Sequence, residues 1–295
     1  MYKRQPYGHR EKPLDVEELK VRRERLKSTN VDTRFVKLFM DGVPTASRTA
    51  AMIEPYTPAT EGGETTKGSL HIGEEVLTRD LTALDKAGFT VKIHTAGDRS
   101  VRVALNAIEA TRKANGNSDL RHELAHAGYI SDEDLPRFAE LNVVADLSPY
   151  IWNPSPIIDS VVTAVGSPRG EHYWPVKSLI KSGAPLLAGS DWPAAAANMS
   201  PWAAIEALVT RTDPVGDYPG KLWPEEAITL EQALDIFTLQ SARALRLGDS
   251  TGSVEIGKSA DLIVLNQNLF EVPVTAVSDT QVERVLFEGR VVVGD

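Results

Sequence analysis

The sequence predicts an α/β fold built on a parallel sheet, either open or closed into a barrel, with a small β unit behind it. Apolar, strand-like runs alternate with helical patterns up to about residue 250, and short β runs separated by Gly and Asn turns follow over 251–295. Strict alternation of strand and helix is typical of a parallel sheet, because each parallel connection has to cross over.

The elements can be assigned in order from their local patterns. A charged, amphipathic helix comes first, and a Thr229 N-cap opens the last one. The segment Val43–Leu70, rich in Thr, Gly, Pro and Glu, is long enough to be a lid or binding loop. Strands are expected at Phe35–Met40, Thr90–His94, Leu120–Ala125, Val143–Leu147 and Pro185–Ala188. Helices are expected at Val16–Lys27, Gly73–Ala87, Arg99–Ala114, Asp132–Leu141, Tyr173–Ser182, Pro201–Arg211 and Leu230–Leu247.

Composition excludes several classes of protein. A net charge of -9 and a pI near 5.3 argue against nucleic acid as a partner, since no basic stripe is present to neutralise phosphates. The absence of cysteine excludes disulfides and thiolate metal sites, so a metal would need His, Asp, Glu or a modified Lys. No apolar run suggests a membrane span or a secretory signal. We therefore expect a cytoplasmic protein that acts on a small molecule, with homo-oligomers left open.

A lysine interrupts the first expected strand. In "RFVKLFMDG" the residues around Lys37 are apolar on both alternating faces, as in a strand that is buried on both sides. Such a lysine either extends to solvent or pairs with a distant carboxylate. Alternatively it loses its proton easily and serves as a nucleophile or a modified ligand.

Three further polar side chains stand at the ends of expected strands. His94 ends "VKIH", His126 follows "RHELA", and Asp191 follows "LLAGS". Each alone has an ordinary explanation, as a structural histidine or a helix cap. Together with Lys37 they form a nitrogen and oxygen set of the kind that binds Zn²⁺ or Mn²⁺ at the carboxyl edge of a parallel sheet. A lysine that has taken up CO₂ becomes an anionic carbamate, and bound cations would then supply the charge that compensates it.

Several segments together resemble the amidohydrolase superfamily, within it the YtcJ-like (amidohydrolase 3) branch. The resemblance covers about Phe35 to Val293. It rests on "FVKLFMDGVPTASRTAAM", "IHTAGDRSVRVALNAIE", "RHELAHAGYISDEDL", "LLAGSDWPAA", "PWAAIEALVTR", "ITLEQALDIFTLQSARAL" and "GSVEIGKSADLIVL". It implies the C-terminal part of a (β/α)8 TIM-type barrel over residues 6–250, with strands 4 to 8 of that fold. Residues 251–295 would be strands of a small β-sandwich.

The resemblance also implies roles for single residues. Carboxylated Lys37 would bridge two divalent cations, with Zn²⁺ expected first and Mn²⁺ or Fe²⁺ as alternatives, and His94 and His126 would bind the second cation. Asp191 would bind the first cation and carry the proton from the attacking water to the leaving amine. Arg48 would bind a carboxylate or carbonyl of the substrate, or else form a salt bridge in its own loop. Trp192 would line an apolar wall of the substrate pocket, or else pack in the core. The expected reaction is hydrolysis of a small amide or N-substituted formamide.

Three departures from the family pattern keep other functions open. None of the six histidines form the H-x-H pair that binds the first cation, and Ala125 stands where a Glu usually precedes the histidine. The first three strands of the family's barrel and the N-terminal part of its β unit are also not found in this sequence. Residues Met1–Gln5 back-translate, with a GTG start, to a sequence like a transposon end used in library preparation, so we expect them to be adapter and the gene to continue upstream. From this chain alone we expect weak metal binding and little activity. A non-catalytic ligand-binding barrel, or an ester or lactone hydrolase, remains an alternative.

Overall fold

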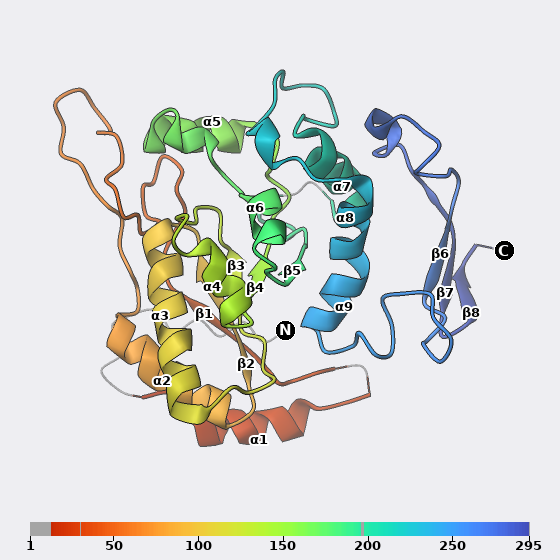
Figure 1. Ribbon diagram of the computed structural model, residues 1–295, viewed down its shortest axis with the longest axis horizontal. Coiled ribbons are helices and arrows are strands. Elements are labelled where there is room, and N and C mark those ends of the chain that lie inside the picture. Colours follow the sequence, from red (N-terminus) through yellow and green to blue (C-terminus); the bar gives the residue numbers. More distant parts are fainter. Residues whose placement is uncertain (1–12, 30, 196–197, 295) are drawn as a thin grey trace.

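A five-stranded parallel sheet and a separate three-stranded antiparallel sheet form the framework of the computed structural model, which describes residues 13–29, 31–195 and 198–294 (Figure 1). The expected adapter, Met1–Gln5, lies outside these residues. The strands are β1 Phe35–Phe39, β2 Thr90–Thr95, β3 Glu123–His126, β4 Val144–Asp146, β5 Leu186–Leu187, β6 Leu262–Leu265, β7 Val282–Phe287 and β8 Arg290–Val293.

Helices connect the parallel strands. The α-helices are α1 Val16–Leu26, α2 Glu74–Lys86, α3 Asp98–Asn115, α4 Leu135–Glu140, α5 Pro156–Val165, α6 Val176–Lys181, α7 Pro201–Thr210, α8 Leu230–Asp235 and α9 Ser241–Ala244. Short 3-10 turns are η1 Arg169–Glu171, η2 Pro224–Glu226 and η4 Val274–Ala276, and η3 Ile236–Gln240 is a π-helical segment. Within the described ranges, no helix is both long and apolar enough to cross a membrane.

The parallel strands are ordered as they occur in the chain, β1-β2-β3-β4-β5. Helices α2 and α3 pack against each other and against β2. A nearly continuous apolar core fills the space between helices and sheet. Consecutive parallel strands joined by helices are the repeating unit of a β/α barrel, so the fold is α/β and part of a TIM-type barrel. The sequence prediction of this fold class is confirmed.

Strand β1 differs from the expectation of burial on both sides. It pairs with β2 alone, and four of its five residues, Lys37 among them, are only half-buried. An edge position explains this, because the outer side of β1 has no described strand beside it. The apolar pattern therefore identified a strand of the parallel sheet and overstated how deeply this strand lies.

Two helical regions were not read correctly from the sequence. Helix α5 was missed, although Ser155 caps it by accepting a hydrogen bond from the Ile158 amide and a proline follows the cap. The helix expected over Leu230–Leu247 is instead divided by the π-helical segment η3 into α8 and α9. The Thr229 cap of α8 is confirmed and forms a complete capping box with Gln232.

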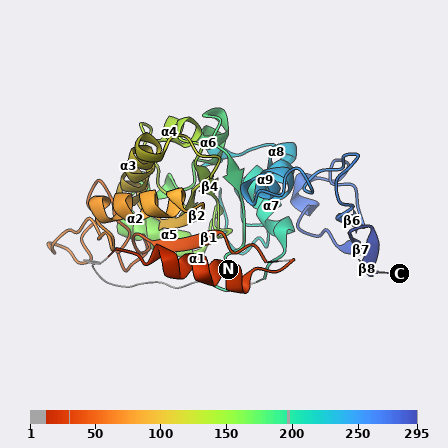
Figure 2. The same ribbon diagram turned by 90° about the horizontal axis from the view of Figure 1, so that it is seen from below.

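The antiparallel sheet β6-β7-β8 lies at the end of the molecule opposite α2 and α3 (Figure 2). Its connecting segment is fixed to the barrel part by Glu206 of α7, whose buried carboxylate accepts a hydrogen bond from the Ser278 amide at 2.8 Å. Leu269 and Val277 of the same segment are buried in the main core. The small sheet is thus attached through α7 rather than through the parallel strands.

Candidate functional site

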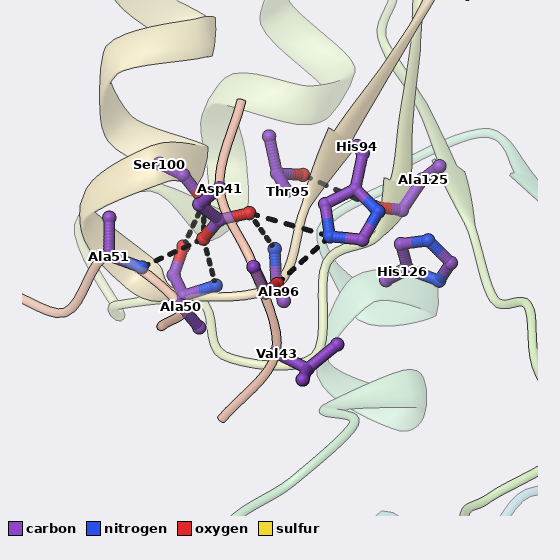
Figure 3. A network of polar contacts seen from close by, with 12 residues as sticks. Asp41, Val43, Ala50, Ala51, His94, Thr95, Ala96, Ser100, Ala125 and His126 are labelled. Atoms are coloured by element: carbon purple, nitrogen blue, oxygen red, sulfur yellow. Dashed lines mark hydrogen bonds and ion pairs between the residues drawn. The ribbon is translucent and has the colours of Figure 1, made fainter. Parts of the chain in front are cut away.

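Two histidine rings lie side by side at the carboxyl ends of neighbouring strands. His94 lies near the carboxyl end of β2, and His126 is the last residue of β3. In the register of these two strands, His94 pairs with Ala125 and Thr95 pairs with His126. Their ring centroids are 4.3 Å apart and the planes meet at 65° (Figure 3). The parallel register brings the two strand ends to one edge, as the sequence predicted.

Hydrogen bonds to carbonyl oxygens fix the protonation of both rings. His94 Nε2 donates to the Gly42 carbonyl at 2.9 Å, and His126 Nδ1 donates to the Ser148 carbonyl. A carbonyl oxygen only accepts, so His94 Nε2 and His126 Nδ1 each carry a proton. Nδ1 of His94 then carries no proton, which is the state in which an imidazole nitrogen binds a metal.

The surroundings of His94 keep it uncharged. The ring is buried and stacks on Phe39 of β1, with centroids 3.9 Å apart. Burial, with smaller effects from the nearby His126 and Lys37, lowers the pKa of His94 to about 2, against the hydrogen bond to the Gly42 carbonyl. At neutral pH, protons therefore do not compete with an approaching cation for the unprotonated nitrogen of this ring.

A carboxylate that sequence reasoning missed stands behind His94. Asp41 is fully buried and lies 3.6 Å from His94 Nε2. Its oxygens accept hydrogen bonds from the amides of Ala51, Ala96 and Gly97 and from the Ser100 hydroxyl (Figure 3). Burial raises the pKa of Asp41 to about 6, against those hydrogen bonds. Its signal in the sequence was an acidic residue directly after a strand, in "FMDG".

Below the imidazoles, charged side chains occupy the sheet interior. Lys37 of β1, Lys92 of β2 and Glu123 of β3 are successive partners in the ladder. Lys92 forms an ion pair with buried Asp146 of β4, and its Nζ lies 3.7 Å from Glu123. Three of these residues were not among the predicted site residues, although each interrupts an apolar strand as Lys37 does: Lys92, Glu123 and Asp146. Lys37 is close enough to this cluster for its charge to lower the pKa of Glu123.

Asp191 and Trp192 follow β5 on a separate segment. Asp191 is half-buried, and the indole of Trp192 is 53% exposed. The charge of Asp191 contributes to raising the pKa of Lys92, so its carboxylate is near enough to Lys92 to act on it. Across residues 13–29, 31–195 and 198–294, no three His, Asp or Glu side chains are gathered closely enough to hold a metal ion. The full set of predicted ligands therefore stays a prediction, and the histidine pair is the part that the structure brings together.

Arg48 lies in the long loop after β1. Its Nε donates to the Thr57 carbonyl at 3.1 Å and its Nη1 to the Ala46 carbonyl at 2.9 Å, so the side chain holds the loop together. Its predicted contact with substrate stays a prediction. Arg48, His126 and Asp191 all have positive φ angles, at 49°, 75° and 49°.

His122 and His172 have other roles. His122 is fully buried and accepts from the Val91 amide at 3.1 Å, while its other nitrogen donates to Asp85 at 3.1 Å. Both nitrogens are therefore occupied, as expected of a structural histidine. His172 stacks on Trp223, with centroids 4.7 Å apart.

Comparisons with known proteins agree with this arrangement. The profile of the Amidohydrolase family (Amidohydro_3) matches residues 9–293. Protein LONG AFTER FAR-RED 3 of Arabidopsis thaliana is 33% identical over 80% of this chain and 39% of its own length. Putative amidohydrolase YtcJ of Bacillus subtilis is 27% identical over 91% of this chain and 49% of its own. An N-substituted formamide deformylase of Arthrobacter pascens is 28% identical over 69% and 36%.

A solved structure extends the likeness to three dimensions. An uncharacterized metal-dependent hydrolase from Pyrococcus horikoshii OT3 superimposes with a TM-score of 0.71 at 27% identity, over 88% of this chain and 50% of that one. The chain thus spans about half the length of this structure and between 36% and 49% of the three curated relatives.

Proposed function

Because the chain belongs to the amidohydrolase family and its YtcJ-like branch, we propose that it carries the catalytic part of a metal-dependent hydrolase of non-peptide C–N bonds. The observation that supports this most directly is the pair of adjacent imidazoles at the carboxyl ends of β2 and β3, each with one nitrogen that donates to a carbonyl oxygen. A small amide or an N-substituted formamide is the proposed substrate class, since one relative is named as a deformylase of such compounds.

The residues fit a divalent cation at the imidazole pair. His94 Nδ1 and His126 Nε2 would hold it with Lys37 as the proposed further ligand, and Asp191 would bind the other cation that the resemblance implies. When bound, such a cation lowers the pKa of a water molecule and polarises a substrate carbonyl. Zn²⁺ is proposed first, because two imidazoles with oxygen ligands suit it, and Mn²⁺ or Fe²⁺ are the alternatives.

The chain's own groups would bind and orient the substrate and move its proton. Asp191 follows β5 at the carboxyl edge, where its half-buried carboxylate can take a proton from water and return it to the leaving amine. Phe39 and the buried stack around His94 exclude water from one side of the reaction. The Val43–Leu70 loop, held by Arg48 and Asp41, would cover the substrate.

Metal binding and hydrolysis test this function together. The metal-free chain is titrated with Zn²⁺ and with Mn²⁺, and hydrolysis of an N-substituted formamide, a simple amide, an ester and a lactone is measured. We expect His94→Ala and His126→Ala each to lower Zn²⁺ affinity at least about tenfold and to abolish any hydrolysis. His172→Ala removes an exposed histidine of another surface and is the matched control. Unchanged metal affinity in both site variants would refute the proposal.

A non-catalytic ligand-binding barrel is the second candidate. It is favoured by one observation, that the described part of the chain gathers no three His, Asp or Glu side chains for a metal. This candidate predicts that the chain binds a small amide or carboxylate with no turnover in the presence of any of these metals. Cleavage of the ester or lactone without cleavage of the amides would instead identify an esterase on the same site.

A further inference from the structure

Strand β4 contributes none of the predicted ligands, yet its carboxyl end contacts His126. The Ser148 carbonyl accepts the hydrogen bond from His126 Nδ1. The Ser148 hydroxyl donates to Asp146 Oδ1 at 2.7 Å, and Asp146 is fully buried and ion-paired with Lys92. A continuous series of contacts therefore runs from the charged interior through Asp146 and Ser148 to the histidine.

Asp146 also lies beside the residue that precedes His126 in the parallel sheet. It is the register partner of Ala125, the residue directly before His126. In this branch of the family a glutamate is expected at position 125, where it would support the histidine. Strand β4 thus places the carboxylate of Asp146 beside Ala125, whose own side chain has no carboxylate.

The same serine contacts the segment that leads to Asp191. A Cβ atom built on Gly189 would lie 2.7 Å from the Ser148 hydroxyl oxygen, so the backbone two residues before Asp191 passes directly over that hydroxyl. Glycine at 189 permits this close approach. Ser148 therefore contacts both His126, through its carbonyl oxygen, and the segment that carries Asp191.

We propose that Asp146 is a positioning residue, which holds Ser148 in place so that the Ser148 carbonyl keeps His126 protonated on Nδ1 and presents Nε2 to a ligand. The purpose assigned to that nitrogen, binding a divalent cation, rests on the proposed function. The hydrogen-bonding role does not, because it concerns the metal-free protein. Partners that orient a ligating histidine through its other nitrogen typically change metal affinity 10- to 100-fold.

The test compares Ser148→Ala, Asp146→Ala and the double variant in the full chain. Nitrogen-15 NMR of the metal-free protein at neutral pH reports which ring nitrogen of His126 is protonated. We expect the Nδ1–H form alone in the wild type and a mixture of both forms in each single variant. The double variant should be no worse than either single one, since the two residues act in series. Zn²⁺ affinity, measured by competition with a chelator, should fall about 10- to 100-fold in the same variants.

Glu206→Gln is the matched control, because it also removes a buried carboxylate with a hydrogen-bond partner but lies on α7. It should leave the protonation of His126 unchanged. Persistence of the pure Nδ1–H form in both Ser148→Ala and Asp146→Ala would overturn the inference. If Asp146→Ala fails to fold, Ser148→Ala, which lacks one hydroxyl, decides alone. A wild-type chain that shows the Nδ1–H form yet binds no Zn²⁺ would contradict the proposed function and leave this inference standing.

Discussion

Glu123 is the residue whose ionisation should weigh most on stability. It is 2% exposed, and its Oε1 has no hydrogen-bond partner among the described residues. Burial raises its pKa to about 7 from 4.5, with Lys92 and Lys37 opposing the rise and Asp146 adding to it. Because the pKa is higher in the folded state, the stability contributed by this group is complete below pH 4.5 and is lost as the pH rises through about 7.

Glu123→Gln removes that dependence while keeping the shape of the side chain. Between pH 4.5 and about pH 8, the free energy of unfolding of the wild type should fall relative to that of the variant by at most about 3 kcal/mol. Urea unfolding at both pH values measures this difference.

Asp134→Asn supplies a control of opposite sign. Hydrogen bonds from Ser131, Arg137 and Arg102 outweigh burial and lower the pKa of Asp134. Its stabilising contribution is therefore present at neutral pH and lost in acid. The free energy of unfolding of the asparagine variant should thus fall further below that of the wild type at about pH 8 than at low pH. Parallel pH profiles for wild type and Glu123→Gln would contradict the role given to Glu123.

At the scale of elements, the loop after β1 depends on one carboxylate. Asp41 receives four hydrogen bonds, one from Ala51 in the loop, two from the turn between β2 and α3, and one from Ser100 in the first turn of α3. Asp98, at the start of α3, adds a further anchor by accepting from the Ile53 amide at 2.7 Å. These contacts hold a segment with no helix or strand of its own against the carboxyl ends of the strands.

Asp41→Asn should release this loop. An amide in place of the carboxylate turns one acceptor oxygen into a donor that faces other donors, which should cost about 2–4 kcal/mol of unfolding free energy. Limited proteolysis should then cleave the exposed stretch around residues 58–66 faster than in the wild type. Asp85→Asn is the control, because Asp85 is equally buried and bonded but lies on α2, so it should lower stability without speeding cleavage there. Equal cleavage rates in both variants would contradict the anchoring role.

The sequence predicted what local periodicity encodes and missed what depends on contacts across strands. Alternating apolar runs placed all five parallel strands, and the strand ends predicted the His94 and His126 pair. The partners of those rings come from elsewhere: Asp41 from the end of β1 and Ser148 from beyond β4. No pattern within one segment shows which neighbouring strand will supply a carboxylate, so the place of Asp146 opposite Ala125 became visible only through the register.

On the scale of the whole molecule, both sheets end in edge strands, of which β5 packs against η3 and α9. Strands β1 and β5 each have a single partner strand in the described structure, as do β6 and β8. The small sheet also carries exposed apolar side chains on its strands, namely Ile263, Val264, Val291, Val292 and Val293. Flat apolar edges of this kind pair readily with other chains, so we expect the protein to associate with copies of itself as its concentration rises.

Lysine substitutions on the small sheet should reduce that association. Ile263 is 50% and Val292 56% exposed, so Ile263→Lys and Val292→Lys should lose little packing and add charge at the surface that other copies would contact. Light scattering over a concentration series should show the apparent mass of these variants falling toward 32.2 kDa, the mass of one chain. Val215→Lys changes an apolar side chain that is 76% exposed in a loop outside both sheets, and it should leave the association unchanged. A wild type that stays at the mass of one chain across the series would show that neither sheet edge recruits a second copy. Association unaffected by either lysine would instead assign it to the border of the parallel sheet, where β1 and β5 are the strands to alter next.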